Sequence, residues 1–321
     1  MPLLRFIPEA TNIDFVGLRF IAFTIDGILL LISIVSIAVQ GFNLGIDFKG
    51  GVLMEVKAAQ VIQVAQMRRD IISLGFSDPV VQNYGGNGEC DHPVNSCVMI
   101  RVMPREAKPG ENQSVIDQQV VSTITAKLGP HYSYRRTSVV GPKVSGELLH
   151  DGVVATLLAI AMISIYVSVR FEWQYGIGAA VATGHDVLVT AGLFSVFHLD
   201  FTLTSIAALL TLAGYSINDT VVVFDRIREN RRKYKRMGLA DLINLSTNQM
   251  LTRTVLTSAA TAISILPLLL FGGPALFDFT AAILFGIVVG TFSSTYVAAA
   301  LLLYLPAPAG TTADTSETAA A

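Results

Sequence analysis

Charged residues are scarce in this chain of 321 amino acids. Asp, Glu, Lys and Arg together make up 14% of the sequence, whereas hydrophobic residues make up 52%. Soluble proteins carry about 25% charged residues, so this composition argues against an ordinary soluble protein and favours an integral membrane protein. Seven of the 22 basic residues lie between positions 225 and 236, beside an apolar run. Membrane topology accounts for such a block, so no nucleic-acid partner is expected.

The motifs of common catalytic sites are also missing. The sequence contains no P-loop, dinucleotide-binding fingerprint, HExxH pair or nucleophile elbow. ATP hydrolysis by this chain is therefore not expected. We predict that the chain is not an enzyme and that it binds no cofactor.

Cysteine is rare. The two cysteines, Cys90 and Cys97, flank a short segment with the sequence CDHPVNSC. They could form a disulfide in an oxidising compartment, and two free thiols are the alternative. His92 lies between them, but a metal site here would lack a fourth ligand. No metal site is predicted.

Long apolar runs dominate what is present. Six of them are long enough to cross a bilayer as helices, which takes about 20 residues each. They cover residues 17–39, 148–169, 174–197, 201–224, 250–271 and 279–305. A polar segment at 40–147 separates the first two runs and is long enough for one small domain. The sequence therefore predicts six transmembrane helices with an inserted domain.

Basic residues flank these runs unevenly. They occur at Arg5, Arg19 and Arg170 and in a dense block within 225–248, whereas the short loops at 198–200 and 272–278 contain none. Short loops rich in Lys and Arg stay on the cytoplasmic side of a membrane. This rule predicts that segments 1–16 and 225–248 are cytoplasmic and that domain 40–147 lies outside. The small, polar residues of 306–321 predict a disordered cytoplasmic tail.

Domain 40–147 shows alternating strand and helix patterns. Its expected order is β-α-β-β-α-β, which is the ferredoxin-like arrangement with two helices on one face of a sheet. The expected strands are 52–57, 79–84, 98–103 and 131–140, and the expected helices are 60–74 and 111–128.

Glycine-rich segments border this domain at Gly45–Gly51 and Val140–Glu147. Glycine allows positive φ and close backbone approach, which suits a sharp junction. By composition alone, however, two ordinary loops are the favoured interpretation. The residues of interest in these junction motifs are Asp47, Gly50, Gly51, Gly141, Pro142 and Glu147.

Asp219 is the most informative single residue, because it lies within the apolar run 201–224. A carboxylate inside a membrane helix costs about 2.5–3.5 kcal/mol on insertion scales. We expect it to bind and release a proton or an ion during transport. Arg253 enters the next, antiparallel run at a comparable depth, so the two side chains could face each other. A purely structural ion pair between two helices is the alternative.

Two further polar features lie within the apolar runs. His185 and Asp186 are adjacent in the middle of the third run, where a pair of ionisable residues is not expected to face lipid. They could form a proton relay, and a hydrogen-bonded packing contact is the alternative. Asp26 lies in the first run, and the sequence assigns it no role.

Four segments together resemble the SecD/SecF family of bacterial protein-export membrane proteins. They are Gly45–Gly51, Val140–Leu148, Gly214–Asn230 and Asn248–Ser258. The third, GYSINDTVVVFDRIREN, is long and specific. At Thr252 the family often has serine instead, and the loop bounded by Cys90 and Cys97 is not a general family feature.

The resemblance implies a six-helix half of an RND-type transporter in the bacterial inner membrane, with SecD supplying the other half. It implies that Asp219 and Arg253 contribute to a proton path at the interface with SecD. His185 and Asp186 are further candidates from their place in the third run alone. The expected role is to use the proton-motive force in late preprotein translocation and release. The expected partners are SecD, the SecYEG translocon and preproteins, with YajC and YidC as additional candidates. Half of an RND-type small-molecule exporter and a non-energised scaffold of the translocon are the alternative functions.

Overall fold

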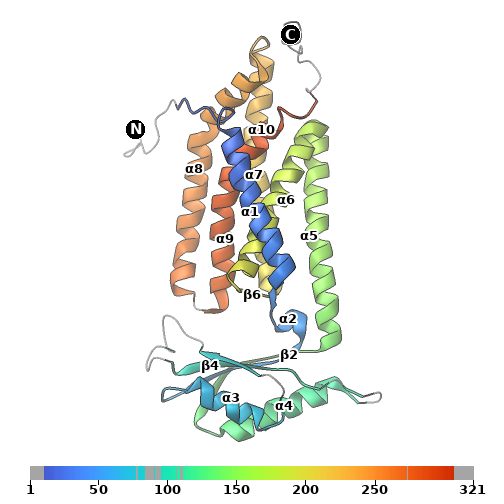
Figure 1. Ribbon diagram of the computed structural model, residues 1–321, viewed down its shortest axis with the longest axis vertical. Helices are drawn as coiled ribbons and strands as arrows, with labels where there is room; N and C mark the ends of the chain where they lie inside the picture. The colour runs from blue at the N-terminus through green and yellow to red at the C-terminus, as the bar shows by residue number, and fades with distance from the viewer. Residues whose placement is uncertain are drawn as a thin grey trace.

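Six long helices form an upright bundle, with a small α/β domain at one end (Figure 1). The computed structural model describes residues 11–76, 79–83, 90, 95–105, 107–108, 111–272 and 274–306. The predicted tail lies outside the described residues except for its first position, as does the start of the predicted N-terminal segment. Among the described residues, six helices are long and apolar enough to cross a membrane. The predicted fold class, a helical membrane protein with an inserted α+β domain, is confirmed.

The bounds of the bundle helices extend beyond most of the apolar runs. The helices are α1 (Arg19–Gln40), α5 (Pro142–Arg170), α6 (Trp173–Val196), α7 (Leu203–Lys233), α8 (Leu239–Phe271) and α9 (Pro274–Phe292). A π-helix, η1 (Ser293–Ala298), continues α9 and leads into α10 (Ala299–Leu301). The segment expected to be a loop at 225–248 is largely helical, because α7 carries most of the basic block in its last turns. Only a short turn at 234–238 separates α7 from α8.

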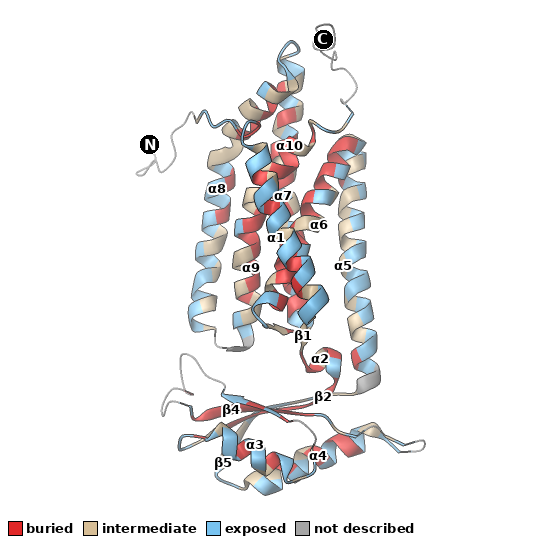
Figure 2. Cartoon of the chain, in the orientation of Figure 1, coloured by how far each residue is buried: buried red, intermediate tan, exposed pale blue. Residues whose placement is uncertain are grey.

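Helices α6 and α7 lie at the centre of the bundle. In their most apolar stretches, 61% and 50% of the residues are buried, whereas the figure is 11% for both α5 and α8. Figure 2 shows this contrast as red on α6 and α7 and mainly pale blue and tan on α5 and α8. Small residues permit the close packing of α6, since a Cβ atom at Gly192 would lie 2.2 Å from Ser33 Oγ of α1.

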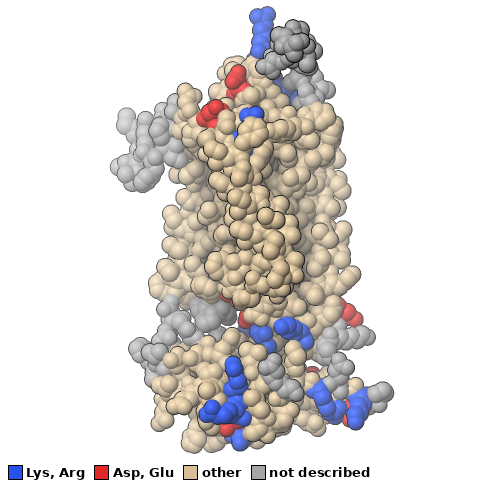
Figure 3. Space-filling model, viewed as in Figure 1, with Lys and Arg blue, Asp and Glu red and all other residues tan. Residues whose placement is uncertain are grey.

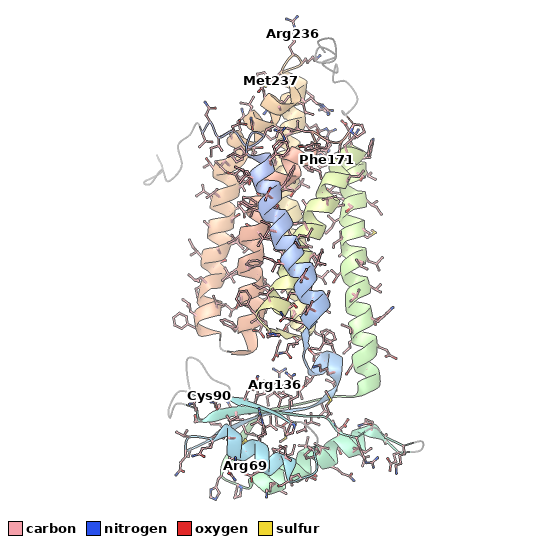
Figure 4. The ribbon with its side chains drawn as sticks, in the orientation of Figure 1. Arg69, Cys90, Arg136, Phe171, Arg236 and Met237 are labelled. Atoms are coloured by element: carbon pink, nitrogen blue, oxygen red, sulfur yellow. A yellow bond between two sulfur atoms is a disulfide. The ribbon has the colours of Figure 1, made fainter. Side chains whose placement is uncertain are left out.

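Charge is distributed along the molecule as a membrane protein requires. On the face drawn in Figure 3, the coloured charged atoms gather over the inserted domain and at the opposite end of the bundle. The surface between these ends is almost uniformly uncharged on that face. Phe171, Arg236 and Met237 mark the end of the bundle opposite Cys90 of the inserted domain (Figure 4).

The inserted domain has a four-stranded antiparallel sheet in the order β3-β4-β2-β5. Its elements follow the chain as strand, helix, strand, strand, helix, strand, in agreement with the ferredoxin-like expectation. They are β2 (Gly51–Ala58), α3 (Val64–Ile72), β3 (Val80–Asn83), β4 (Cys97–Val102), α4 (Gln113–Leu128) and β5 (Tyr132–Val140). Both helices cover the sheet face that points away from the bundle (Figure 1).

An apolar core holds this domain together. Val52 and Ile100 of the sheet pack with Ile71 of α3 and Ile124 of α4, and all four side chains are fully buried. Cys90 and Cys97 form a disulfide, the pairing that the sequence allowed. The residues between them are outside the described set except at 95 and 96. The domain is therefore held by apolar packing and by one covalent link.

The two junctions are not the ordinary loops that composition favoured. The first contains a short helix, α2 (Ile46–Lys49), followed by Gly50 and Gly51 with φ values of 74° and 120°. Only glycine adopts such values without strain. A Cβ at Gly51 would also lie 2.7 Å from the carbonyl oxygen of Val102, so the sheet itself requires this glycine.

The second junction begins α5. Gly141 is the residue before the first turn of α5, and Pro142 occupies a position where its missing N–H costs nothing. Glu147 lies within α5 and is exposed. The helix thus starts six residues before the expected apolar run, directly from the last strand of the sheet. A rigid connection replaces the predicted loop.

Polar contacts attach the inserted domain to the bundle. Arg101 of β4 forms an ion pair of 3.4 Å with Asp200, and Asn43 donates a hydrogen bond to the same carboxylate. Asn43 and Asp200 belong to two short paired strands, β1 (Asn43–Leu44) and β6 (Asp200–Phe201). Asp47 of α2 accepts a hydrogen bond from the backbone N–H of Leu203, the first residue of α7. The domain is therefore linked directly to the start of the central helix α7.

Candidate functional site

Asp219 is buried in the middle of α7, with 7% of its surface exposed. Its Oδ1 accepts a hydrogen bond from Thr254 Oγ1 of α8 at 2.8 Å. Its Oδ2 accepts one from Ser294 Oγ of η1 at 2.6 Å. The carboxyl group thus joins three elements and does not face lipid. Hydroxyl groups both donate and accept, so this environment can accommodate either protonation state of Asp219.

Arg253 is next to Thr254 on α8, and its charge acts on Asp219 without a direct contact. It is exposed and lines a cleft of about 480 Å³, together with Asp225, Arg226 and Glu229. The expected direct contact between Asp219 and Arg253 is absent from the ion pairs of the described residues. Successive residues of a helix are turned by about 100°, so Thr254 and not Arg253 faces Asp219. The cleft lies at the end of the bundle that Phe171 marks in Figure 4.

Asp186 is the centre of a second buried cluster. It is fully buried on α6, and its Oδ2 accepts hydrogen bonds from Ser216 of α7 and Ser293 of η1. The Nδ1 atom of His185 lies 3.0 Å from Asp186 Oδ1. The two residues singled out from the sequence are therefore in contact with each other and with the core of the bundle.

Asp26, to which the sequence assigned no role, belongs to this second cluster. It is 4% exposed, and its Oδ1 lies 3.9 Å from Nε2 of His185. Neither oxygen of Asp26 has a hydrogen-bond partner among the described residues. A signal was available in α1, whose buried residues Ala22, Asp26, Ser33 and Ser36 recur at helical spacing on one face.

The π-helix η1 connects the two clusters. Its first residue, Ser293, donates to Asp186, and its second, Ser294, donates to Asp219. π-turns within α-helices are rare and are frequent at functional sites. Two successive hydroxyl groups on one irregular turn thus contact two buried carboxylates on different helices. Nothing in the sequence pattern of 279–305 predicted this irregularity.

The junction residues lie far from these clusters, at the boundary with the inserted domain. Asp47 caps the backbone of α7, and Gly50 and Gly51 turn the chain into β2. Gly141 and Pro142 start α5. In the structure these residues connect the inserted domain to the bundle, and none of them contacts Asp219 or Asp186. Among the described residues, no cluster of His, Cys, Asp and Glu has the geometry of a metal site.

Comparison with known proteins places the chain in a family. Residues 120–307 match the family model described as "Protein export membrane protein SecD/SecF, C-terminal", and residues 35–60 match the "SecD/SecF GG Motif". Gly50 and Gly51 lie within the second match. Together these matches include both junctions and both carboxylate clusters except Asp26.

Curated relatives cover nearly the whole chain. The chain is 40% identical to the protein translocase subunit SecF of Rickettsia bellii, over 93% of this chain and 95% of that protein. It is 41% identical to the protein of the same description from Cereibacter sphaeroides, over 94% of this chain and 92% of that protein.

Solved structures agree. The crystal structure of SecDF from Thermus thermophilus, a translocon-associated membrane protein, matches with a TM-score of 0.77 and 33% identity over 94% of this chain. SecDF in its super-membrane-facing form matches with a TM-score of 0.64 and 32% identity over 95% of this chain. The chain spans 39% and 40% of those two solved chains. From the matching models, the near full-length relatives and the shared fold, we conclude that the chain belongs to the SecD/SecF family of protein-export membrane proteins.

Proposed function

We propose that this chain is a proton-driven subunit of the protein-export machinery, which acts with a SecD partner in late preprotein translocation and release. The observation that carries the proposal is the pair of buried carboxylate clusters joined by η1. Family membership supports a role in export, and these clusters supply a chemistry through which a proton gradient can act.

The contacts of Asp219 favour proton binding over a structural ion pair. A structural pair needs a cation beside the carboxylate, and here the neighbours are the hydroxyl groups of Thr254 and Ser294. Protonation converts the carboxyl group from an acceptor into a donor and an acceptor. The hydroxyl groups of α8 and η1 must then reorient, so a proton at Asp219 acts on the packing of three elements.

In this proposal Arg253 supplies a positive charge at the point where the proton path opens into the cleft. It is one residue from Thr254 and lines the open cleft with Asp225 and Glu229. A small rotation of α8 would bring its guanidinium toward Asp219 and favour release of the proton. One proton crossing a potential of 100 mV provides about 2.3 kcal/mol, and several such steps can drive a domain movement.

The SecD partner would cover the outer helices of the bundle. α5 and α8 are only 11% buried in their most apolar stretches, and they flank α7 on the side where the cleft opens. The solved SecDF chains are more than twice as long as the part that this chain matches. A second six-helix half beside α5, α7 and α8 would enclose the cleft and complete the transporter.

The inserted domain would transmit the movement to the preprotein. The ion pair between Arg101 and Asp200 and the contact of Asp47 with Leu203 connect it to α7, the helix that carries Asp219. The direct start of α5 from β5 provides a second stiff connection. In this proposal the domain is periplasmic, the basic end of α7 is cytoplasmic, and the bacterial inner membrane holds the bundle.

The test is preprotein release from membrane vesicles that contain the chain and SecD, with and without a proton gradient. We expect the gradient to accelerate release with the wild-type chain but not with Asp219→Asn. Asp151→Asn is the matched control, because Asp151 is an exposed aspartate at the start of α5. Equal acceleration in Asp219→Asn would contradict the proposal and leave a non-energised scaffold.

Efflux of small molecules without an effect on preproteins would instead indicate an exporter. The same assay with SecYEG, YajC or YidC depleted would identify which of them takes part.

A further inference from the structure

The contact between α1 and α6 contains three ionisable side chains in a row. Asp26 lies on α1, and His185 and Asp186 lie on α6. The imidazole is between the two carboxylates, with its Nε2 atom 3.9 Å from Asp26 and its Nδ1 atom 3.0 Å from Asp186. The side chains of the three residues are 6%, 10% and 0% exposed, respectively. Ionisable residues inside a membrane bundle are costly and usually pair with one another. The number of protons that these three side chains hold together therefore determines how well they are paired.

Asp186 accepts the most hydrogen bonds of the three side chains. Ser216 and Ser293 both donate hydrogen bonds to its Oδ2. An ionised Asp186 only accepts hydrogen bonds, so in that state the Nδ1 atom of His185 carries a hydrogen and donates it to Oδ1. Three donors therefore stabilise the negative charge of Asp186. They also fix the tautomer of a neutral His185, which leaves Nε2 as an acceptor that faces Asp26.

Asp26 is in the opposite situation. Neither of its oxygens has a hydrogen-bond donor among the described residues, and Nε2 of His185 has no partner within hydrogen-bond geometry, although the backbone of Asp26 also acts on the imidazole. An ionised carboxylate buried without donors is strongly unfavourable, and so is an unpaired neutral group. One proton between Oδ1 of Asp26 and Nε2 of His185 reduces both penalties. It can reside as a carboxyl O–H that points at Nε2, or as an imidazolium N–H that points at the carboxylate.

We propose that Asp26, His185 and Asp186 form a second proton-binding site, in which Asp26 and His185 share one exchangeable proton and Asp186 is the fixed counter-anion. In the transfer step the O–H bond of Asp26 breaks and an N–H bond forms at Nε2 of His185, which yields a carboxylate and an imidazolium. The two atoms must approach by about 1 Å to reach hydrogen-bond distance. A small movement of α1 against α6 thus controls where the proton is. As a part of the driving path, this site rests on the function proposed above.

Few other ionisable groups act on this site. α7 contributes Asp219, which is connected to Asp186 through Ser294 and Ser293 of η1. α5 carries Glu147, His150 and Asp151 near its start and Arg170 at its end, α1 carries Arg19 at its start, and α9 carries Asp278 near its start. These groups lie near the ends of the bundle. Protonation of the shared site is therefore governed by its own members and by the neighbouring carboxylate, Asp219.

The shared site is best tested at His185 itself. We would use the full chain with its SecD partner in lipid nanodiscs, and replace His92, His131, His150 and His198 by Gln. Nitrogen-15 NMR of the remaining imidazole then reports its protonation and tautomer across pH, without any gradient or preprotein. We expect hydrogen on Nδ1 whenever the ring is neutral. We also expect Asp26→Asn to move the ring's transition to lower pH by about one unit or more, because an anion that stabilises the imidazolium is lost.

Two variants keep this test decisive. Asp26→Glu restores a carboxylate and should move the transition back toward that of the parent protein, whereas an effect of misfolding would persist. Asp151→Asn removes an exposed carboxylate of α5 and should leave the transition of His185 unchanged. An identical transition in Asp26→Asn and its parent would overturn the shared site. Loss of gradient-driven release in Asp219→Asn is a separate measurement, so either proposal can fail without the other.

Discussion

The inserted domain and the membrane bundle fill their interiors with different residues. The core of the inserted domain consists of apolar side chains such as Val52, Ile71 and Ile100. The inserted domain buries Glu55, Arg101 and Asp117 outside this apolar core. The bundle also contains apolar clusters, but it buries Asp26, Asp186 and Asp219 on helices within the membrane-spanning part. Large apolar residues of the bundle are instead exposed on its outside, as Val169 of α5 is with 81% of its surface accessible.

The difference follows from the two solvents. In water, apolar side chains must be buried to stabilise a domain, so they take the interior positions. In a bilayer, apolar side chains can face lipid at no cost, so burial of apolar residues contributes little to helix association. Interior positions of the bundle are thus available to polar groups. Because burying polar groups there is costly, we attribute their presence to function. Mutations in the two regions should accordingly have effects of different kinds.

The largest effect on stability is expected from the core of the inserted domain. Ile100 is fully buried, and Ile100→Ala should destabilise the domain by about 2–5 kcal/mol through lost burial and a residual cavity. Urea unfolding of the full chain, followed by proteolysis of the inserted domain, measures this loss. Val115→Ala is the matched control on the exposed face of α4. If both variants unfold at the same urea concentration, the apolar core does not hold the domain.

A smaller loss of stability is expected when the disulfide is removed. Cys90 and Cys97 are separated by seven positions, and closing so short a loop contributes about 2–3 kcal/mol by restricting the unfolded chain. The double variant Cys90→Ser with Cys97→Ser should lower the urea midpoint of the inserted domain by this amount. Its gradient-driven release, measured where the domain remains folded, should stay at the wild-type level. Loss of release in a folded domain would mean that the disulfide serves function and not only stability.

A still smaller effect, and one on function, is expected from Ser294→Ala. This change removes one of the two hydroxyl donors to Asp219 and should cost about 1 kcal/mol, or roughly a fivefold reduction in the rate of gradient-driven release. Ser264→Ala is the matched control, because Ser264 lies on the exposed face of α8 and bonds only its own helix. Equal rates in the two variants would show that η1 does not act on Asp219.

The smallest effect is expected at the surface of the inserted domain. The hydrogen bonds from Arg105 and from the backbone of Lys108 hold the pKa of Glu111 below its usual value of 4.5. A lowered pKa stabilises the fold above the unfolded value, and this contribution is lost as pH falls through the folded value. Both partners are largely exposed, so Glu111→Gln should leave the urea midpoint unchanged at neutral pH. A clear decrease would show that this exposed pair stabilises the domain.

Sequence patterns predicted the elements better than their contacts. Six apolar runs and the alternating strands and helices of 40–147 identified the fold, because hydrophobic periodicity depends only on local sequence. The starts of α5 and α8 and the end of α7 were not predicted. These parts of the helices lie outside the apolar runs, and a helix can continue beyond an apolar run into polar sequence. The run 201–224 therefore gave no sign that α7 reaches Lys233.

The candidate site shows the same limit. Asp219 was identified because a carboxylate in an apolar run is conspicuous on its own. The contact of Asp26 with His185 depends on how α1 and α6 are aligned, and single-residue signals do not contain that alignment. The rotation of α8 likewise decided that Thr254, and not Arg253, faces Asp219. Partners across helices are set by packing, and they had to come from the structure.

Proton movement through the bundle can be measured directly in liposomes that contain the chain and its SecD partner. A pH-sensitive dye in the lumen would follow proton entry after a gradient is imposed. Our account predicts fast entry with the wild-type chain, and entry with Asp219→Asn no faster than in liposomes without protein. Entry at the wild-type rate in Asp219→Asn would contradict it, because protons would then cross without the buried carboxyl group.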